Sequence, residues 1–343
     1  MTISVAIAGA SGYAGAELIR LLSQHPHFEV KTLAAGSFAG SEVGTVHPQL
    51  GHFNSWNFVE TSSETLNGHD LVLLALPHGQ SAALVSGLDP KTKIVDLGAD
   101  FRLQSESDWQ QFYGSTPHAG SWTYGLSEIF GTELIASSQF VANPGCYATA
   151  ISLGAAPGVA SQIIDSSDLV VVAASGTSGA GRNATVALLG AEVMGSISAY
   201  KIGGLHQHTP EIEQTLQSLT HSEVKLSFTP LLAPMSRGIH ATITAKLTRP
   251  ITTAAVRAIY GEYFSDSTFV QLLAEGQQPK TSSVYGSNFV QMQVVIDEHT
   301  QRLVVTVVID NLVKGAAGQA IQNANIMFGI AADTGLQQMG IAP

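Results

Sequence analysis

The first 145 residues alternate short apolar runs with segments of helical periodicity. Ile3–Ala8 is a continuous apolar run typical of a buried strand, and apolar positions in Ala14–Gln24 recur at helical spacing. Further strands are predicted at Phe28–Ala35, Asp70–Leu76 and Lys93–Leu97. Strands that alternate with helices favour a parallel, doubly wound sheet of the Rossmann type.

After about residue 165 the pattern changes to strands in blocks. The predicted strands are Asp168–Ser175, Glu223–Pro230, Gly238–Leu247, Phe289–Asp297 and Gln301–Asp310. Helical segments are predicted at Thr209–Leu219, Thr252–Phe264 and Ala316–Ile330. We therefore expect a first α/β domain over residues 1–145 and an α+β domain with a mostly antiparallel sheet over 146–314. The segment 315–343 is expected to pack back on the first domain.

Composition excludes several classes of protein. Of 343 residues, 45% are hydrophobic and 12% charged, which excludes a disordered chain. Mean hydropathy is +0.20, yet no apolar run approaches the roughly 18 residues of a membrane-spanning helix. The net charge of −11, without a basic run, argues against nucleic acid as a partner. The apolar, β-rich second half predicts a sheet-mediated homodimer or homotetramer.

The single cysteine and the start of the chain indicate the compartment. One cysteine excludes an internal disulfide framework and a cysteine-based zinc site, and we expect no metal. The chain enters a strand at once, without the cationic start and cleavage site of a signal peptide. The prediction is a cytoplasmic protein in a reducing compartment.

A glycine-rich segment follows the first predicted strand and opens the first helix. Its G-x-x-G-x-x-G spacing is a relative of the dinucleotide fingerprint, in which glycines let the backbone approach a pyrophosphate at a helix N-terminus. The alternative is a tight strand-to-helix turn without a ligand. The expected cofactor-binding residues are Gly9, Ser11, Gly12, Tyr13, Ala14 and Gly15.

The end of the second predicted strand indicates which dinucleotide binds. An acidic residue there would accept hydrogen bonds from the ribose of NAD. Residues 33–40 contain no acid, and the first one is Glu42. Ser37 and the nearby backbone suit a 2′-phosphate instead. We therefore expect NADP(H).

Cys146 follows a Pro144-Gly145 turn and begins an apolar, helical stretch. A helix N-terminus favours the thiolate, which is the nucleophilic form. A small buried apolar residue is the alternative. A nucleophilic thiol beside a nicotinamide predicts reduction of an acyl phosphate through a thioester.

Eight segments resemble a known family, in the family's order and over nearly the whole chain. These are 9–17, 74–79, 96–102, 143–149, 175–182, 206–212, 234–238 and 310–320. The sequence resembles the N-acetyl-γ-glutamyl-phosphate reductases of arginine biosynthesis, which are related to aspartate-semialdehyde dehydrogenase. The cysteine segment and His206-Gln207-His208 are the most specific. Gln207 departs from the arginine usual in the family.

The resemblance implies roles for particular residues. Cys146 would attack the acyl phosphate, and His206 or His208 would be the acid/base, with His206 slightly favoured. An imidazole titrates near neutrality, so it can take the thiol proton and later protonate the aldehyde oxygen. The other cofactor-binding residues expected are Ser37, Pro77, Ser178, Gly179, Asn311 and Gly315.

Arginines inside glycine-rich motifs are the expected anion-binding groups, since the chain has only 15 Lys and Arg. A guanidinium matches phosphate and carboxylate bidentately. By resemblance, Arg102 would bind the phosphate, while Arg237 is the carboxylate candidate. Arg182 and Asn143 complete the substrate-binding set. A structural ion pair is the alternative for each arginine.

Three functions remain open at this stage. The leading one is NADPH-dependent reduction of N-acetyl-γ-glutamyl phosphate to the semialdehyde. A second is reduction of aspartyl phosphate, or of a carrier-linked glutamyl or aminoadipyl phosphate, although this acidic chain lacks a basic surface for a carrier. A third is a non-catalytic NADP-binding regulator.

Overall fold

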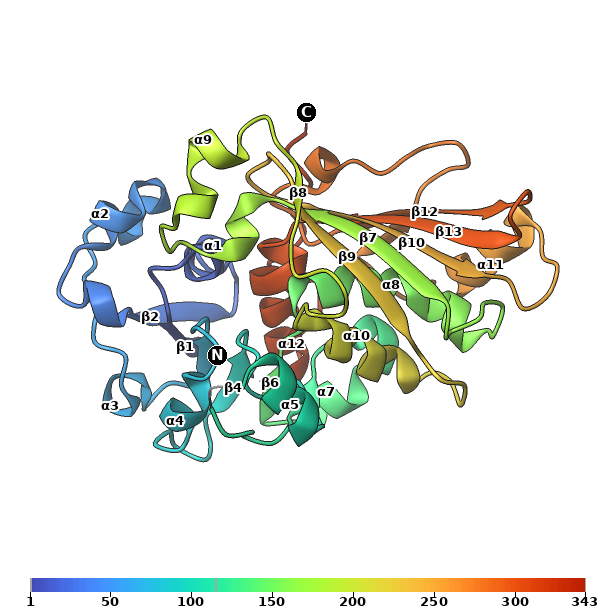
Figure 1. The fold of residues 1–343 in the computed structure, drawn as a ribbon. Helices are drawn as coiled ribbons and strands as arrows, with labels where there is room; N and C mark the ends of the chain where they lie inside the picture. The colour runs from blue at the N-terminus through green and yellow to red at the C-terminus, as the bar shows by residue number, and fades with distance from the viewer. Residues whose placement is uncertain (1, 115, 343) are drawn as a thin grey trace. The chain divides into compact units, whose positions relative to one another are not determined.

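The computed structural model describes residues 2–114 and 116–342 (Figure 1). Contacts divide the chain into two compact units. The first ends at Gly145 and also includes Ala316–Gln338, and the second is Cys146–Gly315 with the chain from Met339 onward. Met1 and Pro343, the outer ends of the predicted segments 1–145 and 315–343, lie outside the described residues.

The first unit contains a six-stranded sheet in which every pairing is parallel. Its strands are β1 (Ile3–Ala8), β2 (Phe28–Ala34), β3 (Leu71–Leu74), β4 (Lys93–Asp96), β5 (Thr123–Tyr124) and β6 (Phe140–Ala142). Their spatial order is β2-β1-β3-β4-β6-β5. The predicted doubly wound sheet is thus confirmed, with β5 and β6 as additions.

The strand order identifies where this sheet binds a ligand. The chain passes from β1 to β2 on one side, and then from β2 to β3 on the other side of β1, so the strand order reverses at β1. In open α/β sheets the ligand crevice lies at such a switch point, outside the carboxyl ends of the strands. Here those ends are Gly9 and the segment after Leu74.

Helices and turns of the first unit surround this sheet. They are α1 (Tyr13–Leu22), η1 (Gly36–Phe38), α2 (Val43–Val46), η2 (Pro48–Phe53), α3 (Ser63–Leu66), α4 (Ser81–Val85), α5 (Glu106–Phe112), α6 (Ser127–Phe130), α7 (Glu133–Ser137) and α12 (Gly318–Met327). The returning helix α12 packs against α1, β4 and α7. Most of these helices are too short to show helical periodicity, which is why sequence patterns missed them.

The second unit contains a seven-stranded, mostly antiparallel sheet, as predicted. Its strands are β7 (Leu169–Ser175), β8 (Ser198–Ala199), β9 (Leu226–Leu232), β10 (Ile239–Lys246), β11 (Val270–Leu272), β12 (Val290–Asp297) and β13 (Arg302–Ile309). The order is β11-β12-β13-β10-β7-β9-β8. The edge strands β8 and β11 have two or three residues, too few for an alternating pattern.

Helices cover one face of this sheet (Figure 1). They are α8 (Cys146–Ala160), α10 (His208–Gln217) and α11 (Thr253–Tyr263), with α9 (Gly190–Val193), η3 (Thr177–Ala180), η4 (Val186–Leu188), η5 (Thr281–Val284) and the π-helical turn η6 (Val313–Ala317) in the connections. α8 packs on β10 and β13, and its residues 147–159 are buried. On the other face, Val170 and Val172 are exposed. No helix in the described part of the chain is long and apolar enough to cross a membrane.

Candidate active site

The glycine-rich loop after β1 is closely packed. Gly9 has φ +80°, and a Cβ there would lie 2.1 Å from the Ala75 carbonyl oxygen. A Cβ at Gly15 would lie 2.4 Å from the Gly9 carbonyl oxygen. Both positions require glycine, because the obstructing atoms are backbone. The loops after β1 and β3 therefore touch at the switch point of the sheet.

The start of α1 suits a bound phosphate. Gly12 caps this helix in extended conformation, and no side chain caps it. The first N–H groups of a helix lack intrahelical partners and attract anions. Ser37 is exposed in η1, directly after β2, where a ribose is bound in such folds. These features fit a nicotinamide dinucleotide.

Two buried carboxylates that were not predicted shape the segment after β3, which contains Pro77. Asp100 accepts hydrogen bonds from the backbone N–H groups of Gly79 (2.6 Å), Ser81 (2.9 Å) and Ala82 (3.2 Å). Asp96 accepts from the Ser81 hydroxyl at 2.8 Å. Burial raises the pKa of Asp96 to about 6. Both residues lie in the motif that includes Arg102.

Arg102 and Asn143 lie together in the first unit. The buried Arg102 donates from Nε to the Asn143 carbonyl (2.8 Å) and from Nη2 to the Leu97 carbonyl (2.7 Å). The Asn143 amide donates to the Ala316 carbonyl (3.2 Å) and accepts from Asn323 on α12 (3.1 Å). These contacts order the turn that ends at Gly145.

Cys146 is the first residue of α8, as the sequence predicted, and its side chain is half-buried. Gly315, in the π-helical turn η6, packs against it: a Cβ at Gly315 would lie 2.7 Å from the Cys146 Cβ. The neighbouring Tyr147 hydroxyl donates to the Leu231 carbonyl at 3.2 Å. Leu231 pairs with Ala174 at the carboxyl end of β7. The cysteine thus lies at this end of the seven-stranded sheet.

Three loops are hydrogen-bonded to one another at the same end of the seven-stranded sheet. Ile239 pairs with both Ser175 and Ile309. The loops after β7, before β10 and after β13 therefore lie side by side at one end of the sheet. Asn311 accepts from the Gly238 N–H (2.7 Å) and donates to the Ser178 hydroxyl (3.0 Å). Gly179 lies in the loop with Ser178. The second unit thus brings Ser178, Gly179, Arg237, Asn311 and Gly315 to the end of the sheet that carries Cys146.

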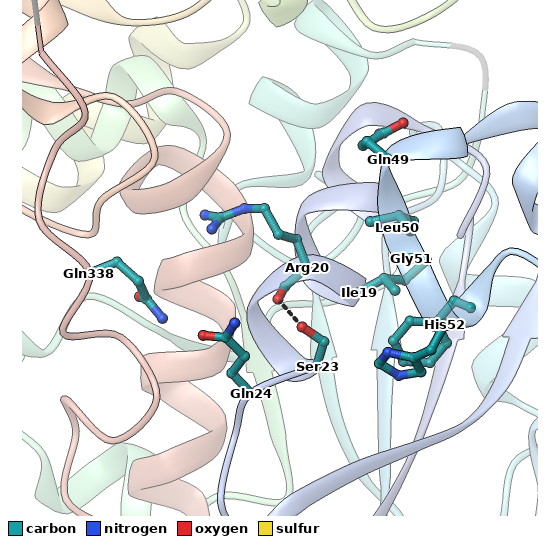
Figure 2. A pocket seen from close by; sticks show the side chains of 10 residues that line it. Ile19, Arg20, Ser23, Gln24, Gln49, Leu50, Gly51, His52 and Gln338 are labelled. Carbon is teal, nitrogen blue, oxygen red and sulfur yellow. Dashed lines mark hydrogen bonds between the residues drawn. The ribbon is translucent and has the colours of Figure 1, made fainter.

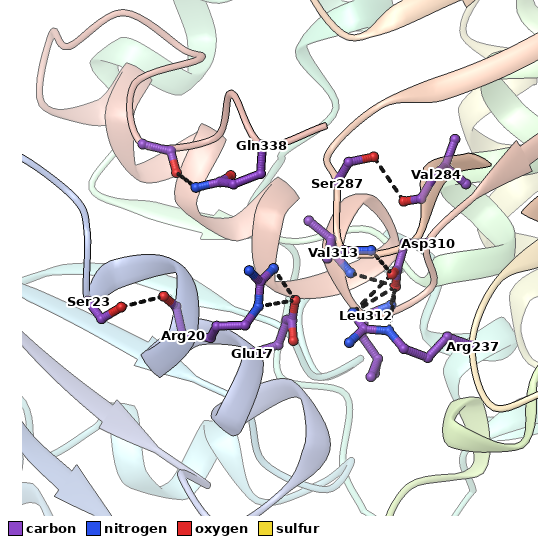
Figure 3. A network of polar contacts seen from close by, with 12 residues as sticks. Glu17, Arg20, Ser23, Arg237, Val284, Ser287, Asp310, Leu312, Val313 and Gln338 are labelled. Atoms are coloured by element: carbon purple, nitrogen blue, oxygen red, sulfur yellow. Dashed lines mark hydrogen bonds and ion pairs between the residues drawn. The ribbon is translucent and has the colours of Figure 1, made fainter. Parts of the chain in front are cut away.

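Arg237 is held by a fully buried carboxylate, Asp310. The guanidinium approaches it at 3.0 Å, and the backbone N–H groups of Leu312 (2.8 Å) and Val313 (3.3 Å) donate to it (Figure 3). The backbone N–H of Gly286 also donates to it, at 2.7 Å. Asp310 is a residue that the sequence analysis did not assign. Arg182, which follows the loop with Ser178, is exposed.

The two histidines differ in environment. His206 is buried at 3% exposure, and its Nδ1 accepts the backbone N–H of His208 at 3.1 Å. Burial lowers the pKa of His206 to about 2. His208 is the first residue of α10. The rings of both histidines contact Tyr147, the neighbour of Cys146.

Two tyrosines lie near both the histidines and Cys146. The Tyr200 hydroxyl donates to that of Tyr147 at 3.2 Å. Burial, with a smaller contribution from the charge of Cys146, raises the pKa of Tyr200 to about 12. Burial also raises the pKa of Tyr147. Both phenols therefore stay protonated near the sulfur. Tyr200 could not be predicted from the sequence, because no motif surrounds it. Glu211 could have been predicted, because it lies in the histidine segment 206–212, and it is buried in the first turn of α10.

The pocket drawn in Figure 2 lies elsewhere in the first unit. It is lined by Ile19 and Arg20 of α1, by residues 23–24 and 49–53 and by Gln338, and includes none of the predicted site residues. Its arginine, Arg20, is paired with Glu17 at 2.6 Å. Within residues 2–114 and 116–342, no three His, Cys, Asp or Glu side chains are grouped as metal ligands would be.

Comparison with known proteins agrees with this division of the chain. The family described as "Semialdehyde dehydrogenase, NAD binding domain" matches residues 4–137, and "Semialdehyde dehydrogenase, dimerisation domain" matches residues 146–311. The chain is also similar to solved structures of two aspartate-semialdehyde dehydrogenases. Enzyme II from Vibrio cholerae has a TM-score of 0.71 at 15% identity, covering 96% of this chain and 99% of that one. The enzyme from Candida albicans, solved with NADP, has a TM-score of 0.68 at 17% identity, covering 97% and 100%.

The fold and the site thus define a two-unit oxidoreductase of the semialdehyde dehydrogenase class. Among curated proteins, N-acetyl-gamma-glutamyl-phosphate reductase from Streptomyces avermitilis is 51% identical over the whole length of both chains. The relative of the same name from Acidothermus cellulolyticus is also 51% identical over both full lengths. The chain belongs to the N-acetyl-γ-glutamyl-phosphate reductase family, which confirms the resemblance found in the sequence.

Proposed function

We propose that this chain reduces N-acetyl-γ-glutamyl phosphate to the semialdehyde with NADPH, as a step of arginine biosynthesis. The observation that carries the proposal is the position of Cys146 at the first residue of α8, beside Gly315 and at the sheet end that carries Arg237. A thiol there is accessible, and the first turn of α8 favours its anion.

The residues divide the chemistry between them. The proposed acid/base is His208 rather than the slightly favoured His206, because Nδ1 of His206 already accepts the backbone N–H of His208. His208 takes the thiol proton, and the Cys146 thiolate attacks the acyl carbon. The C–O bond to phosphate breaks, and His208 passes its proton to the departing phosphate. When bound, the reduced nicotinamide supplies the hydride that reduces the thioester carbon. The C–S bond then breaks as the aldehyde forms, which returns the thiolate. One proton from solution restores the thiol, so an acyl phosphate, NADPH and H⁺ give an aldehyde, NADP⁺ and phosphate.

The anionic groups of the substrate have matching partners in this proposal. Asp310 orients the planar guanidinium of Arg237, which is the group proposed to bind the α-carboxylate. Arg102 is the proposed phosphate-binding residue, because hydrogen bonds to the carbonyls of Asn143 and Leu97 hold its buried guanidinium near the turn before Cys146. Asn143 orders the turn before Cys146, and Arg182 is an exposed second cation.

The proposed cofactor is NADP(H), held by Gly9, Ser11, Gly12, Tyr13, Ala14 and Gly15, with Ser37 at the 2′-phosphate and Pro77 beside the nicotinamide. Ser178, Gly179, Asn311 and Gly315 complete this set. In support, the segment after β2 presents an exposed serine and no acid. The Candida albicans enzyme of the same fold was solved with NADP.

The proposed assembly is a homodimer or homotetramer formed through the uncovered face of the seven-stranded sheet. Val170 and Val172 are 36% and 42% exposed there. The matching family is described as a dimerisation domain. Apolar side chains on an open sheet face favour burial against a second copy.

Replacing Cys146 by serine tests the proposal. The assay is phosphate-dependent oxidation of N-acetylglutamate semialdehyde with NADP⁺, with aspartate semialdehyde as the competing substrate. We expect the variant to lose about 10³-fold or more of the rate while it still binds NADPH in a fluorescence titration. Undiminished turnover would exclude the covalent route. A preference for aspartate semialdehyde would support the alternative substrate, and absence of turnover on both substrates would exclude both of these reductase assignments.

A further inference from the structure

His206 is enclosed by aromatic rings. Its ring centroid lies 5.3 Å from that of Tyr147, 5.6 Å from Tyr200 and 5.1 Å from Phe228, with interplanar angles of 88°, 65° and 73°. The ring of His208 lies 4.9 Å away. Edge-to-face contacts on this many sides fix the plane of the imidazole.

The polar contacts of His206 are made with the start of α10. Nδ1 accepts the backbone N–H of His208 at 3.1 Å, and the His206 carbonyl accepts that of Thr209 at 2.9 Å. The first N–H groups of a helix have no partner inside it, and the residue before His208, Gln207, makes no side-chain cap. An imidazole therefore caps this helix. An Nδ1 that accepts carries no proton, so the ring proton is on Nε2.

The groups around His206 keep its ring neutral. Burial is the main cause of its low pKa, and the charges of His208 and Lys201 act in the same direction, whereas Glu211 opposes them. The phenols of Tyr147 and Tyr200 remain protonated and add no charge.

We propose that His206 is a positioning residue, a neutral imidazole cap that fixes the first turn of α10 and with it His208. The assignment rests on the proposed function, in which His208 exchanges the proton. It separates the two histidines by role: His206 could accept a proton at Nδ1 only by giving up the cap, whereas His208 takes part in the cap through its backbone N–H.

Conservative and non-conservative variants test the cap. In His206→Asn the side-chain oxygen takes the place of Nδ1, so the cap survives, whereas His206→Leu keeps the volume and loses the acceptor. We expect His206→Asn to retain kcat within about tenfold of the native value, with an unmoved acid limb in the pH profile. His206→Leu should lose about 10²-fold and shift that limb, and His208→Asn should lose about 10³-fold or more. The control is His221→Asn, at an exposed position after α10.

A second measurement covers the case in which the variants do not fold. Nitrogen NMR of the histidine rings in the intact protein, with the His206 signals assigned by their contacts to the rings of Tyr147 and Phe228, should show an Nε2–H tautomer that does not titrate between pH 5 and 8. Titration of His206 near neutrality, or a His206→Asn variant as inactive as His208→Asn, would overturn the proposal. This NMR signal involves no substrate, so it is independent of the outcome for Cys146→Ser.

Discussion

The backbone of Gly315 packs directly against the side chain of Cys146. A Cβ at Gly315 would lie 2.7 Å from the Cys146 Cβ and 3.2 Å from its Cα. Gly315 reaches this position because it lies in a π-helical turn, where its N–H donates to the Asp310 carbonyl at 3.0 Å. Such turns are rare and frequent at functional sites.

Gly315→Ala should therefore reduce activity. The added methyl meets backbone as well as side chain, so the start of α8 must move. We expect kcat/KM to fall about 10²-fold, since small displacements of a reacting group carry costs of that order. The measurements are steady-state kinetics and the rate of thiol alkylation. Gly261→Ala, in α11 with open space around it, is the matched control and should be neutral or stabilising. Equal effects of both changes would contradict the contact.

Arg237→Lys should raise KM for the acyl phosphate about tenfold or more, with a smaller change in kcat. An ammonium cannot keep the bidentate geometry that Asp310 imposes on the guanidinium. Arg302→Lys is the control: Arg302 lies at the opposite end of β13 and pairs with Asp168 at 2.8 Å. An unchanged KM in Arg237→Lys would remove Arg237 from the substrate site.

His206 should make the protein sensitive to acid. Burial lowers its pKa from 6.5 to about 2, so the unfolded chain binds a proton that the folded chain does not. The contribution of His206 to stability is therefore present above pH 6.5 and is lost progressively below it, by at most about 1.4 kcal/mol per pH unit. Urea unfolding at pH 7 and pH 5 should show a smaller loss in His206→Asn than in the native protein. The exposed variant His221→Asn should lose as much as the native protein, and parallel losses in all three would refute a buried neutral ring.

Val172→Lys should dissociate the assembly. A lysine on the uncovered sheet face places a charge where the valine is proposed to be buried against a second copy. Light scattering at micromolar concentration should then report a species near 36 kDa. Leu134→Lys changes a similarly exposed apolar residue on α7 and should leave the mass unchanged. A native protein that is already monomeric would exclude this interface.

Ser37→Asp should change the cofactor preference from NADPH to NADH. A carboxylate after β2 repels a 2′-phosphate and accepts from a ribose hydroxyl. We expect kcat/KM with NADPH to fall about 10²-fold while the value with NADH rises. Ser41→Asp, four residues later, is the control. If the native enzyme already uses NADH as well as NADPH, Ser37 does not decide the cofactor.

Much of the fold was predictable because its signals are local. The buried strands β1 and β2, the long helices α1 and α10 and the long strands of the second sheet each carry their own periodicity, and their bounds agree with the prediction within about four residues. β5, β8 and β11 have two or three residues and exist only because longer neighbours pair with them. The last predicted helix, Ala316–Ile330, is divided into a π-helical turn ending at Ala317 and α12.

By itself, the sequence determined which residues carry chemistry: the glycines of the first loop, Cys146 at a helix start, the histidine pair and the arginines in glycine-rich motifs. These predictions depend on residue type and on short spacing, which the sequence gives directly. Only the tertiary structure decided which atoms meet. Gly315 reaches Cys146 across 169 positions, and Asp310 reaches Arg237 across 73, because the end of one sheet gathers loops that are distant in sequence. The different environments of His206 and His208 have the same origin, since burial and ring contacts come from packing rather than from spacing.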